Sequence, residues 1–122
     1  MVMYYQKKKW IKNWIKCRKA MYKLSFTKSF REDVKSSVNY IKHVLQNPMA
    51  AQRLKDEIKN TNNKIKENPF AYPAVPNEYL ASIGFRFTMV KNYMIFYIVG
   101  NKNIHIIRFL YGHRDWINIL EK

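Results

Sequence analysis

The hydrophobic pattern near the C-terminal end of the chain predicts a β-hairpin. Two runs of β-branched and aromatic residues, Tyr93–Val99 and Asn103–Tyr111, flank a turn signal at Gly100 and Asn101. The first run is apolar at both alternating sets of positions, so it is predicted to be a central strand that is buried on both faces. We expect the chain from residue 21 onward to pack around this hairpin.

Helical spacing upstream predicts two helices joined by a short turn. The first apolar stripe consists of Phe30, Val34, Val38, Ile41 and Leu45. The second consists of Ala51, Leu54, Ile58 and Ile65, with the polar Asn62 standing within the series. Either Thr27 or Ser29 can cap the first helix, and Asn47 followed by Pro48 ends it and starts the second. Two helices with so short a connection form an αα-hairpin.

Shorter patterns complete the predicted fold. Residues 21–26 and 83–90 alternate apolar and polar positions as strands do, residues 69–76 hold three prolines as a loop does, and residues 116–122 can form a last helical turn. The predicted order is β-α-α-β-β-β, an α+β fold. It packs the αα-hairpin on one face of a mainly antiparallel four-stranded sheet and leaves the other face partly open.

The net charge of the chain indicates a class of binding partner. The 23 Lys and Arg against 8 Asp and Glu give a net charge of +15, which favours a polyanionic partner. Residues 1–20 hold seven of these bases and no acid, so residues 21–122 carry a net charge of +8. Trp10 and Trp14 recur at helical spacing in this basic segment, as in an arm that grips nucleic acid or an anionic membrane. We favour a basic extension over 1–20, disordered or upstream of the natural start, and a folded domain over 21–122.

Cysteine usage and hydropathy indicate the compartment of the protein and the kinds of site that it lacks. Cys17 is the only cysteine, which excludes an internal disulfide and a cysteine-based metal site. No apolar run reaches the length of a membrane-spanning helix. We therefore predict a cytoplasmic protein with no cofactor, no metal and no membrane partner.

Several stretches, in order, carry a resemblance to a known family. They are Tyr22-Lys-Leu-Ser-Phe-Thr, Tyr40-Ile41, Asn47-Pro-Met-Ala-Ala51, Asn68-Pro-Phe-Ala-Tyr-Pro73, Phe85-Arg-Phe87, Asn92-Tyr-Met-Ile-Phe-Tyr97 and Ile107-Arg-Phe-Leu-Tyr-Gly-His-Arg-Asp115. With this order and spacing over about a hundred residues, the chain resembles the RelE/ParE superfamily of type II toxin–antitoxin toxins, once called plasmid stabilisation proteins.

The resemblance implies a small basic toxin that is neutralised by a cognate antitoxin. RelE-like members cut mRNA on the ribosome, whereas ParE-like members poison DNA gyrase by binding and need no catalytic residues. Our leading hypothesis is the ribosome-dependent endoribonuclease, with ribosome and mRNA as partners, and the gyrase inhibitor is the alternative. A partly open apolar sheet face would also make the toxin poorly soluble without a short, acidic antitoxin.

Metal-free RNA cleavage needs a base near the 2′-hydroxyl, a cation at the phosphate and an acid at the 5′-oxygen. RelE-like toxins meet these needs with Arg, Lys, Tyr or His side chains on the open sheet face. The matching catalytic candidates are Arg114, His113 and Tyr111, and the candidate nucleic-acid contacts are Arg86, Lys91 and Arg108. His113 is the candidate acid or base because histidine exchanges protons most readily near neutral pH.

One position departs from the RelE-like pattern. Many such toxins carry a phosphate-binding arginine directly after the tyrosine of the Asn92-Tyr93 pair, and here that position is Met94. Loss of such a cation costs about 2–4 kcal/mol of transition-state stabilisation. The purely structural alternative pairs Arg114 with Asp115, uses Trp116 as a lid on the core and turns Tyr111 into the core.

Overall fold

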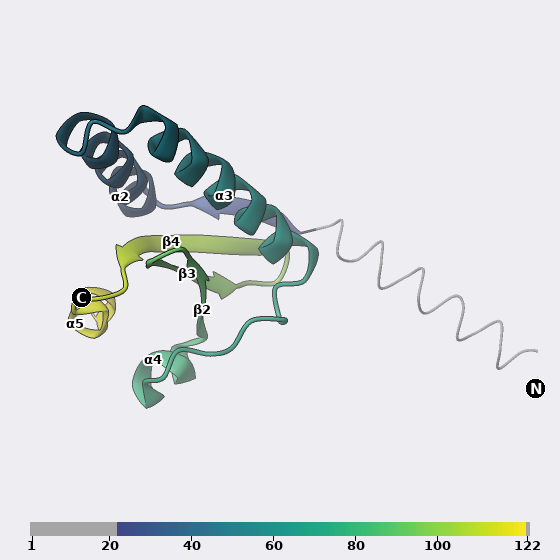
Figure 1. Ribbon diagram of the computed structural model, residues 1–122. Helices are drawn as coiled ribbons and strands as arrows, with labels where there is room; N and C mark the ends of the chain where they lie inside the picture. The colour runs from purple at the N-terminus through teal and green to yellow at the C-terminus, as the bar shows by residue number, and fades with distance from the viewer. Residues whose placement is uncertain (1–21, 122) are drawn as a thin grey trace, which may run out of the picture.

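The computed structural model describes residues 22–121 as a four-stranded sheet with helices on both faces (Figure 1). The strands are β1 (Lys23–Phe26), β2 (Phe85–Val90), β3 (Tyr93–Val99) and β4 (Asn103–Tyr111), in the spatial order β1-β4-β3-β2. β1 runs parallel to β4, and the other two pairings are antiparallel. The predicted mainly antiparallel sheet and its central β3 strand are therefore confirmed. The predicted extension over residues 1–20 lies outside the described residues.

The αα-hairpin covers one face of the sheet. It consists of α2 (Lys28–Asn39), a π-helical turn η1 (Tyr40–Val44) and α3 (Pro48–Glu67). Thr27, not Ser29, caps α2, because its hydroxyl accepts from the Phe30 N–H at 3.0 Å. Asn47 caps α3 as predicted, accepting from the Ala50 N–H at 3.1 Å. The sequence therefore identified this connection correctly.

The first core lies between the αα-hairpin and the sheet. Its buried members are Phe30, Val38, Ala51, Leu54, Ile58, Ile65, Val90, Ile95, Tyr97, Ile104, Ile106 and Phe109. The predicted apolar stripe of the second helix is thus confirmed, but Leu45 at the end of the first stripe is 56% exposed. The π-helical turn explains this, because its wider winding rotates the following residues away from the α-helical phase.

A second core covers the opposite face, and here two expectations were wrong. Residues 83 and 84 do not begin a strand: Ile83 ends the helix α4 (Glu78–Ile83), and Gly84 terminates it in the left-handed region at φ 112°. Helices were also expected on the other face only, and this was wrong. α4 and the terminal helix α5 (Trp116–Glu121) pack on Phe85, Met94, Phe96 and Leu110. In Figure 1 these two helices lie on the side of the sheet opposite α2 and α3.

Candidate functional site

A pocket of about 600 Å³ opens where the sheet meets the end of the αα-hairpin. The turn between β2 and β3, the last residue of β4 and the connection between α2 and α3 form its walls. Its lining residues are Tyr40, Ile41, Leu45, Asn47, Ala50, Leu54, Lys91, Asn92, Tyr93 and Tyr111. Two predicted site residues, Lys91 and Tyr111, therefore lie in one pocket although they are far apart in the sequence.

Backbone geometry fixes the pocket wall at the turn between β2 and β3. Lys91 adopts a left-handed conformation at φ 55°, which is unfavourable for a residue with a side chain, and this tight turn closes the hairpin. The Gly112 N–H donates to the Asn92 carbonyl at 2.8 Å. A Cβ atom at position 112 would stand 3.1 Å from that oxygen, so glycine permits the close approach.

An aromatic row leads out of the pocket. Tyr93 lies edge-on to Tyr111 with ring centroids 5.6 Å apart, and the His113 ring lies 5.2 Å from Tyr111. Tyr93 is anchored in turn by stacking on Phe109 at 4.6 Å. Tyr111 is 41% exposed, so it does not turn into the core. Tyr111 thus lines the pocket with Lys91 on one side and lies beside the His113 ring on the other.

Arg114 follows this row in a turn at the surface. Its backbone N–H donates to the Tyr111 carbonyl at 2.9 Å, which keeps it beside His113. Among the ion pairs of residues 22–121, none joins Arg114 to Asp115. Asp115 instead accepts from the Asn118 amide in α5. Arg114 is exposed, so its guanidinium is accessible from solvent.

Arg108 is held away from this cluster. Its guanidinium donates to both carboxylate oxygens of Asp33, at 2.7 and 3.0 Å. Asp33 also accepts from the Phe109 N–H, where β4 extends beyond its pairing with β1. Since a bidentate carboxylate pair occupies the guanidinium, Arg108 anchors α2 to the free edge of β4.

Arg86 also binds groups of the protein itself. It lies near the start of β2, whereas Lys91 follows the end of that strand. Arg86 donates to the Tyr72 carbonyl at 2.6 Å and stacks over the Phe70 ring at 5.2 Å, so it holds the 69–76 loop. Tyr97 fastens the start of the same loop by donating to the Pro69 carbonyl at 2.6 Å. Burial raises the pKa of Tyr97 to about 12, although the positive charge of Arg86 opposes the rise.

Met94 faces away from the pocket. Successive residues of β3 point to opposite faces of the sheet, so Tyr93 and Ile95 face the αα-hairpin while Met94 joins the second core. Met94 is only 7% exposed, and α5 packs on the same core. The position that carries an arginine in many RelE-like toxins is therefore occupied by a buried apolar side chain.

Sequence reasoning overlooked three residues of the pocket, namely Tyr40, Asn92 and Tyr93. All three belong to stretches that carried the family resemblance, and Tyr40 is an exposed aromatic next to a helix end. Those stretches were the signal available in the sequence, but the π-helical turn that positions Tyr40 leaves no mark in the hydrophobic pattern.

The pocket combines stacking surfaces with exchangeable protons and cations. Exposed tyrosines can stack on unpaired bases, and an imidazole beside a phenol can relay a proton. Lys91 is only loosely held, since its ammonium lies 3.9 Å from the Glu57 carboxylate and both side chains are about half exposed. It therefore remains free to contact a phosphate.

In residues 22–121, no three His, Cys, Asp or Glu side chains lie close enough to share a metal ion. Over the same range, no helix has both the length and the apolar character that crossing a membrane demands.

Comparisons with known proteins agree with this architecture. Residues 24–116 match the sequence model of a family described as the ParE toxin of the type II toxin–antitoxin system, parDE. No curated protein sequence matches the chain. A solved structure of the chromosomal ParDE system from P. aeruginosa is similar with a TM-score of 0.62 at 19% identity, covering 75% of this chain and 96% of that one.

Two further solved structures share the fold. A YoeB/ParE toxin from Agrobacterium tumefaciens aligns with a TM-score of 0.54 at 16% identity, covering 73% of this chain and 96% of that one. A chain of the E. coli DinJ-YafQ toxin–antitoxin complex aligns with a TM-score of 0.50 at 12% identity, covering 75% of this chain and 92% of that one. At such identities the likeness concerns the fold alone.

Proposed function

Because the chain belongs to the ParE toxin family of type II toxin–antitoxin systems, we propose that it arrests growth by cutting mRNA on the ribosome with the cluster of Tyr111, His113, Arg114 and Lys91. The observation that carries the proposal is the open pocket that joins Tyr111 and Lys91, with His113 5.2 Å from the Tyr111 ring. Its exposed tyrosines suit the unstacked bases of single-stranded RNA.

The cleavage is a transesterification within the RNA. His113 or Tyr111 takes the proton of the 2′-hydroxyl, and the 2′-oxygen attacks the neighbouring phosphorus. The bond to the 5′-oxygen breaks, that oxygen receives a proton from the second of the two side chains, and a cyclic phosphate remains. Arg114 and Lys91 stabilise the negative charge that builds on the phosphate oxygens.

The test combines two variants with two readouts in bacteria. The double variant His113→Ala with Arg114→Ala should abolish toxicity, because it removes a proton carrier and a cation from exposed positions without touching either core. The matched control, His105→Ala with Arg53→Ala, removes the same residue types from exposed positions outside the pocket and should stay toxic. Pulse labelling should then show immediate arrest of protein synthesis, with new transcript ends inside translated messages.

DNA gyrase inhibition is the second candidate, and three residues favour it. Arg86 and Arg108 already bind protein groups, and Met94 lies in the second core, so catalysis would rely on fewer cations than in many RelE-like toxins. If replication stops first, messages stay intact and the double variant remains toxic, the endoribonuclease proposal fails and gyrase becomes the target.

We also propose a cognate antitoxin as the physiological partner. Solved structures with similar folds come from a ParDE system and a DinJ-YafQ complex, which supports the same arrangement here. A surface with net positive charge favours an acidic antitoxin. Ribosome and mRNA, the targets of the leading proposal, imply that the toxin acts in the cytoplasm.

A further inference from the structure

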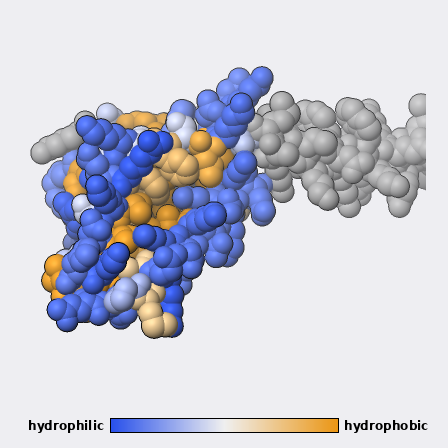
Figure 2. Space-filling model, turned by 90° about the horizontal axis from the view of Figure 1, so that it is seen from above, coloured by the Kyte–Doolittle hydropathy of each residue, from blue (hydrophilic) through white to orange (hydrophobic). Residues whose placement is uncertain are grey.

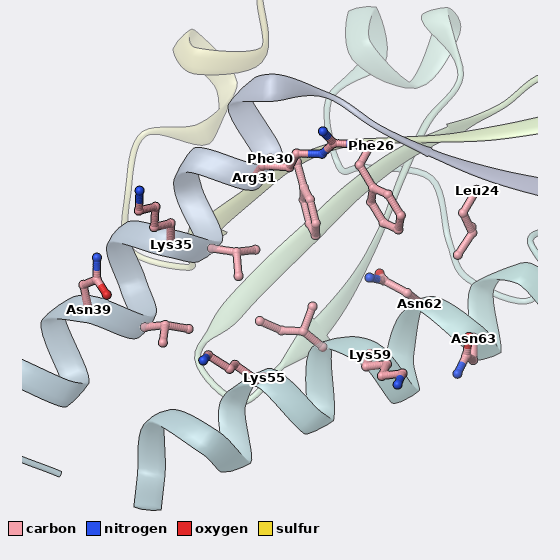
Figure 3. Close-up of a pocket in the computed structure, with 13 residues that line it drawn as sticks. Leu24, Phe26, Phe30, Arg31, Lys35, Asn39, Lys55, Lys59, Asn62 and Asn63 are labelled. Carbon is pink, nitrogen blue, oxygen red and sulfur yellow. The ribbon is translucent and has the colours of Figure 1, made fainter. Parts of the chain in front are cut away.

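Two cavities of similar size lie beside the αα-hairpin, and their chemistry differs. The groove between α2 and α3 has a volume of about 580 Å³, and its apolar side chains form a band between hydrophilic ones in Figure 2. The Oδ1 atom of Asn62 has no donor there among residues 22–121, and basic side chains edge the groove (Figure 3), namely Arg31, Lys35, Lys55 and Lys59. The pocket at the end of the sheet shares no lining residue with the groove and contains tyrosines and amides instead.

The π-helical turn η1 supplies one wall of the pocket at the end of the sheet. The Tyr40 carbonyl accepts from the Leu45 N–H at 3.1 Å, and Gln46 then adopts a left-handed conformation at φ 51°. Tyr40 lines the pocket, yet it is 52% exposed. Single π-helical turns are frequent at functional sites. This irregular turn leaves the flat face of a tyrosine accessible to a ligand.

A β-bulge places Tyr111 on another wall of the same pocket. Ile107 is an extra residue of β4, because the pairing with β3 shifts there. Ile106 before the bulge and Phe109 after it both lie in the first core, although strict alternation would put them on opposite faces. Tyr111, two residues beyond Phe109, therefore faces the αα-hairpin and the pocket. Without the bulge, Tyr111 would lie on the face of the second core.

Asn47 adds a hydrogen-bond donor to the pocket. Its Oδ1 atom accepts from the Ala50 N–H at 3.1 Å, which caps α3. Because the cap engages this oxygen, the Nδ2 group is the part of the amide that remains for a ligand, and it can only donate. Among the described residues that line the pocket there is a lysine, Lys91, but no Asp or Glu. A ligand with an acceptor atom and a negative charge therefore suits this lining.

We propose that the pocket holds one unstacked purine base of the RNA, stacked on Tyr40, with its N7 atom accepting a hydrogen bond from the Nδ2 group of Asn47. Purines carry the N7 acceptor and pyrimidines lack it, so this bond distinguishes the two classes of base. A volume of about 600 Å³ is in the range of small-ligand sites, and single-stranded RNA presents bases that stack on aromatic side chains.

This inference deepens the proposed function and rests on it in one respect: the base is taken to belong to the RNA that is cut. Tyr111 lines the pocket and also lies 5.2 Å from the His113 ring. A base in the pocket therefore places its own ribose and phosphate beside the proposed cleavage cluster. Tyr40 and Asn47 would then select which nucleotide is presented to His113.

The test measures the binding of labelled trinucleotides to the purified full chain by fluorescence anisotropy. The probes carry 2′-O-methyl groups, so they have no 2′-hydroxyl to attack the phosphate, and uracils flank a central guanine, adenine, 7-deazaguanine or uracil. The wild-type chain should bind the guanine and adenine probes about fivefold more tightly than the other two, because only these bases carry N7. Equal affinities for guanine and 7-deazaguanine would overturn the proposal.

Variants of the chain separate stacking from the hydrogen bond. Tyr40→Leu should weaken binding of the guanine probe about fivefold or more, whereas Tyr40→Phe keeps the ring and should stay within about twofold of the wild type. Asn47→Asp retains an oxygen for the helix cap but loses the donor, so it should bind guanine and 7-deazaguanine alike. Tyr79→Leu, at a 60% exposed tyrosine outside the pocket, is the control and should bind as the wild type does. Wild-type affinity in Tyr40→Leu, or a preference for guanine that survives in Asn47→Asp, contradicts the proposed contacts.

The binding assay and the toxicity assay can fail separately. His113→Ala with Arg114→Ala removes two groups of the proposed cleavage cluster but no residue of the pocket lining, so it should keep the preference for bases with N7. If the wild-type chain binds the purine probes selectively but cuts no message in bacteria, the base pocket stands and the endoribonuclease proposal fails. If it cuts messages but binds all four probes alike, the base pocket fails and the endoribonuclease proposal stands.

Discussion

At the residue scale, Tyr97 links the protonation of one side chain to the stability of the fold. Its phenol is fully buried, and its pKa is raised to about 12 by that burial. The folded state therefore keeps the proton between pH 10 and pH 12, where the unfolded chain loses it. The contribution of this proton to the free energy of unfolding is complete below pH 10 and is lost as the pH rises through 12. A shift of two pKa units corresponds to about 3 kcal/mol.

We therefore predict that wild-type protein loses about 2–3 kcal/mol more of its free energy of unfolding between pH 9 and pH 12 than Tyr97→Phe does. Urea denaturation of both proteins across this range measures the difference. Tyr79→Phe, at a 60% exposed tyrosine, is the control and should follow the wild type. If the free energy of unfolding falls equally with pH in wild type and Tyr97→Phe, the Tyr97 hydroxyl loses its proton at the same pH in the folded and the unfolded state, and the prediction is wrong.

The four candidate cations also show why a count of charges does not identify the residues of the candidate site. Arg86, Arg108, Arg114 and Lys91 are equivalent in a charge count, yet two of them bind the protein itself. Asp33 and the Tyr72 carbonyl, which engage the two arginines, lie 75 and 14 residues away in the sequence. Only the fold reveals which cations remain available for a phosphate.

At the element scale, the start of α2 gives a direct test of capping. Thr27 accepts from the Phe30 N–H and donates to the Ile107 carbonyl at 2.6 Å, so it joins the helix to β4. We predict that Thr27→Ala lowers the free energy of unfolding by about 1–2 kcal/mol. Ser29→Ala should change it by less than about 0.5 kcal/mol, because position 29 lies inside the helix and alanine favours helices. Chemical denaturation compares the two, and equal losses would contradict the assignment of the cap.

The end of the first helical segment shows where periodicity fails. Five residues wind as a π-helix at Tyr40–Val44, and Gln46 then adopts a left-handed conformation at φ 51°. Tyr40, Val44 and Leu45 are consequently exposed, although Leu45 continues the three- and four-residue spacing. This turn is also what brings Tyr40 to the candidate catalytic pocket.

At the scale of the whole molecule, the second core depends on the last helix. The Trp116 ring lies 5.4 Å from Phe96, and α5 covers a sheet face that is otherwise apolar. We predict that Trp116→Ala lowers the free energy of unfolding by about 1–3 kcal/mol, less than for a fully buried tryptophan because Trp116 is half-buried. Binding of a hydrophobic dye should rise in Trp116→Ala, because the apolar sheet face that α5 covers becomes exposed.

Tyr79→Ala is the matched control for Trp116→Ala. It removes an exposed aromatic side chain from α4, on the same side of the sheet, and should leave both stability and dye binding close to those of the wild type. Dye binding that is high in the wild type, and unchanged by Trp116→Ala, would mean that α5 does not cover the sheet in solution.

The sequence by itself determined the elements whose signals are local. The hairpin of β3 and β4 follows from two β-branched runs around a turn, and the boundary between the helices follows from Asn47 and Pro48. The toxin family follows from short stretches in a fixed order. Such features are readable because side-chain periodicity and capping act over a few residues.

Only the tertiary structure decided how distant residues meet. It buried Met94 under α5, tied Arg108 to Asp33, and joined Tyr40, Lys91 and Tyr111 in one pocket. It also left Asn62 unpaired in a basic-edged groove. Each outcome depends on which faces pack together, and packing is a property of the whole chain that no local pattern encodes.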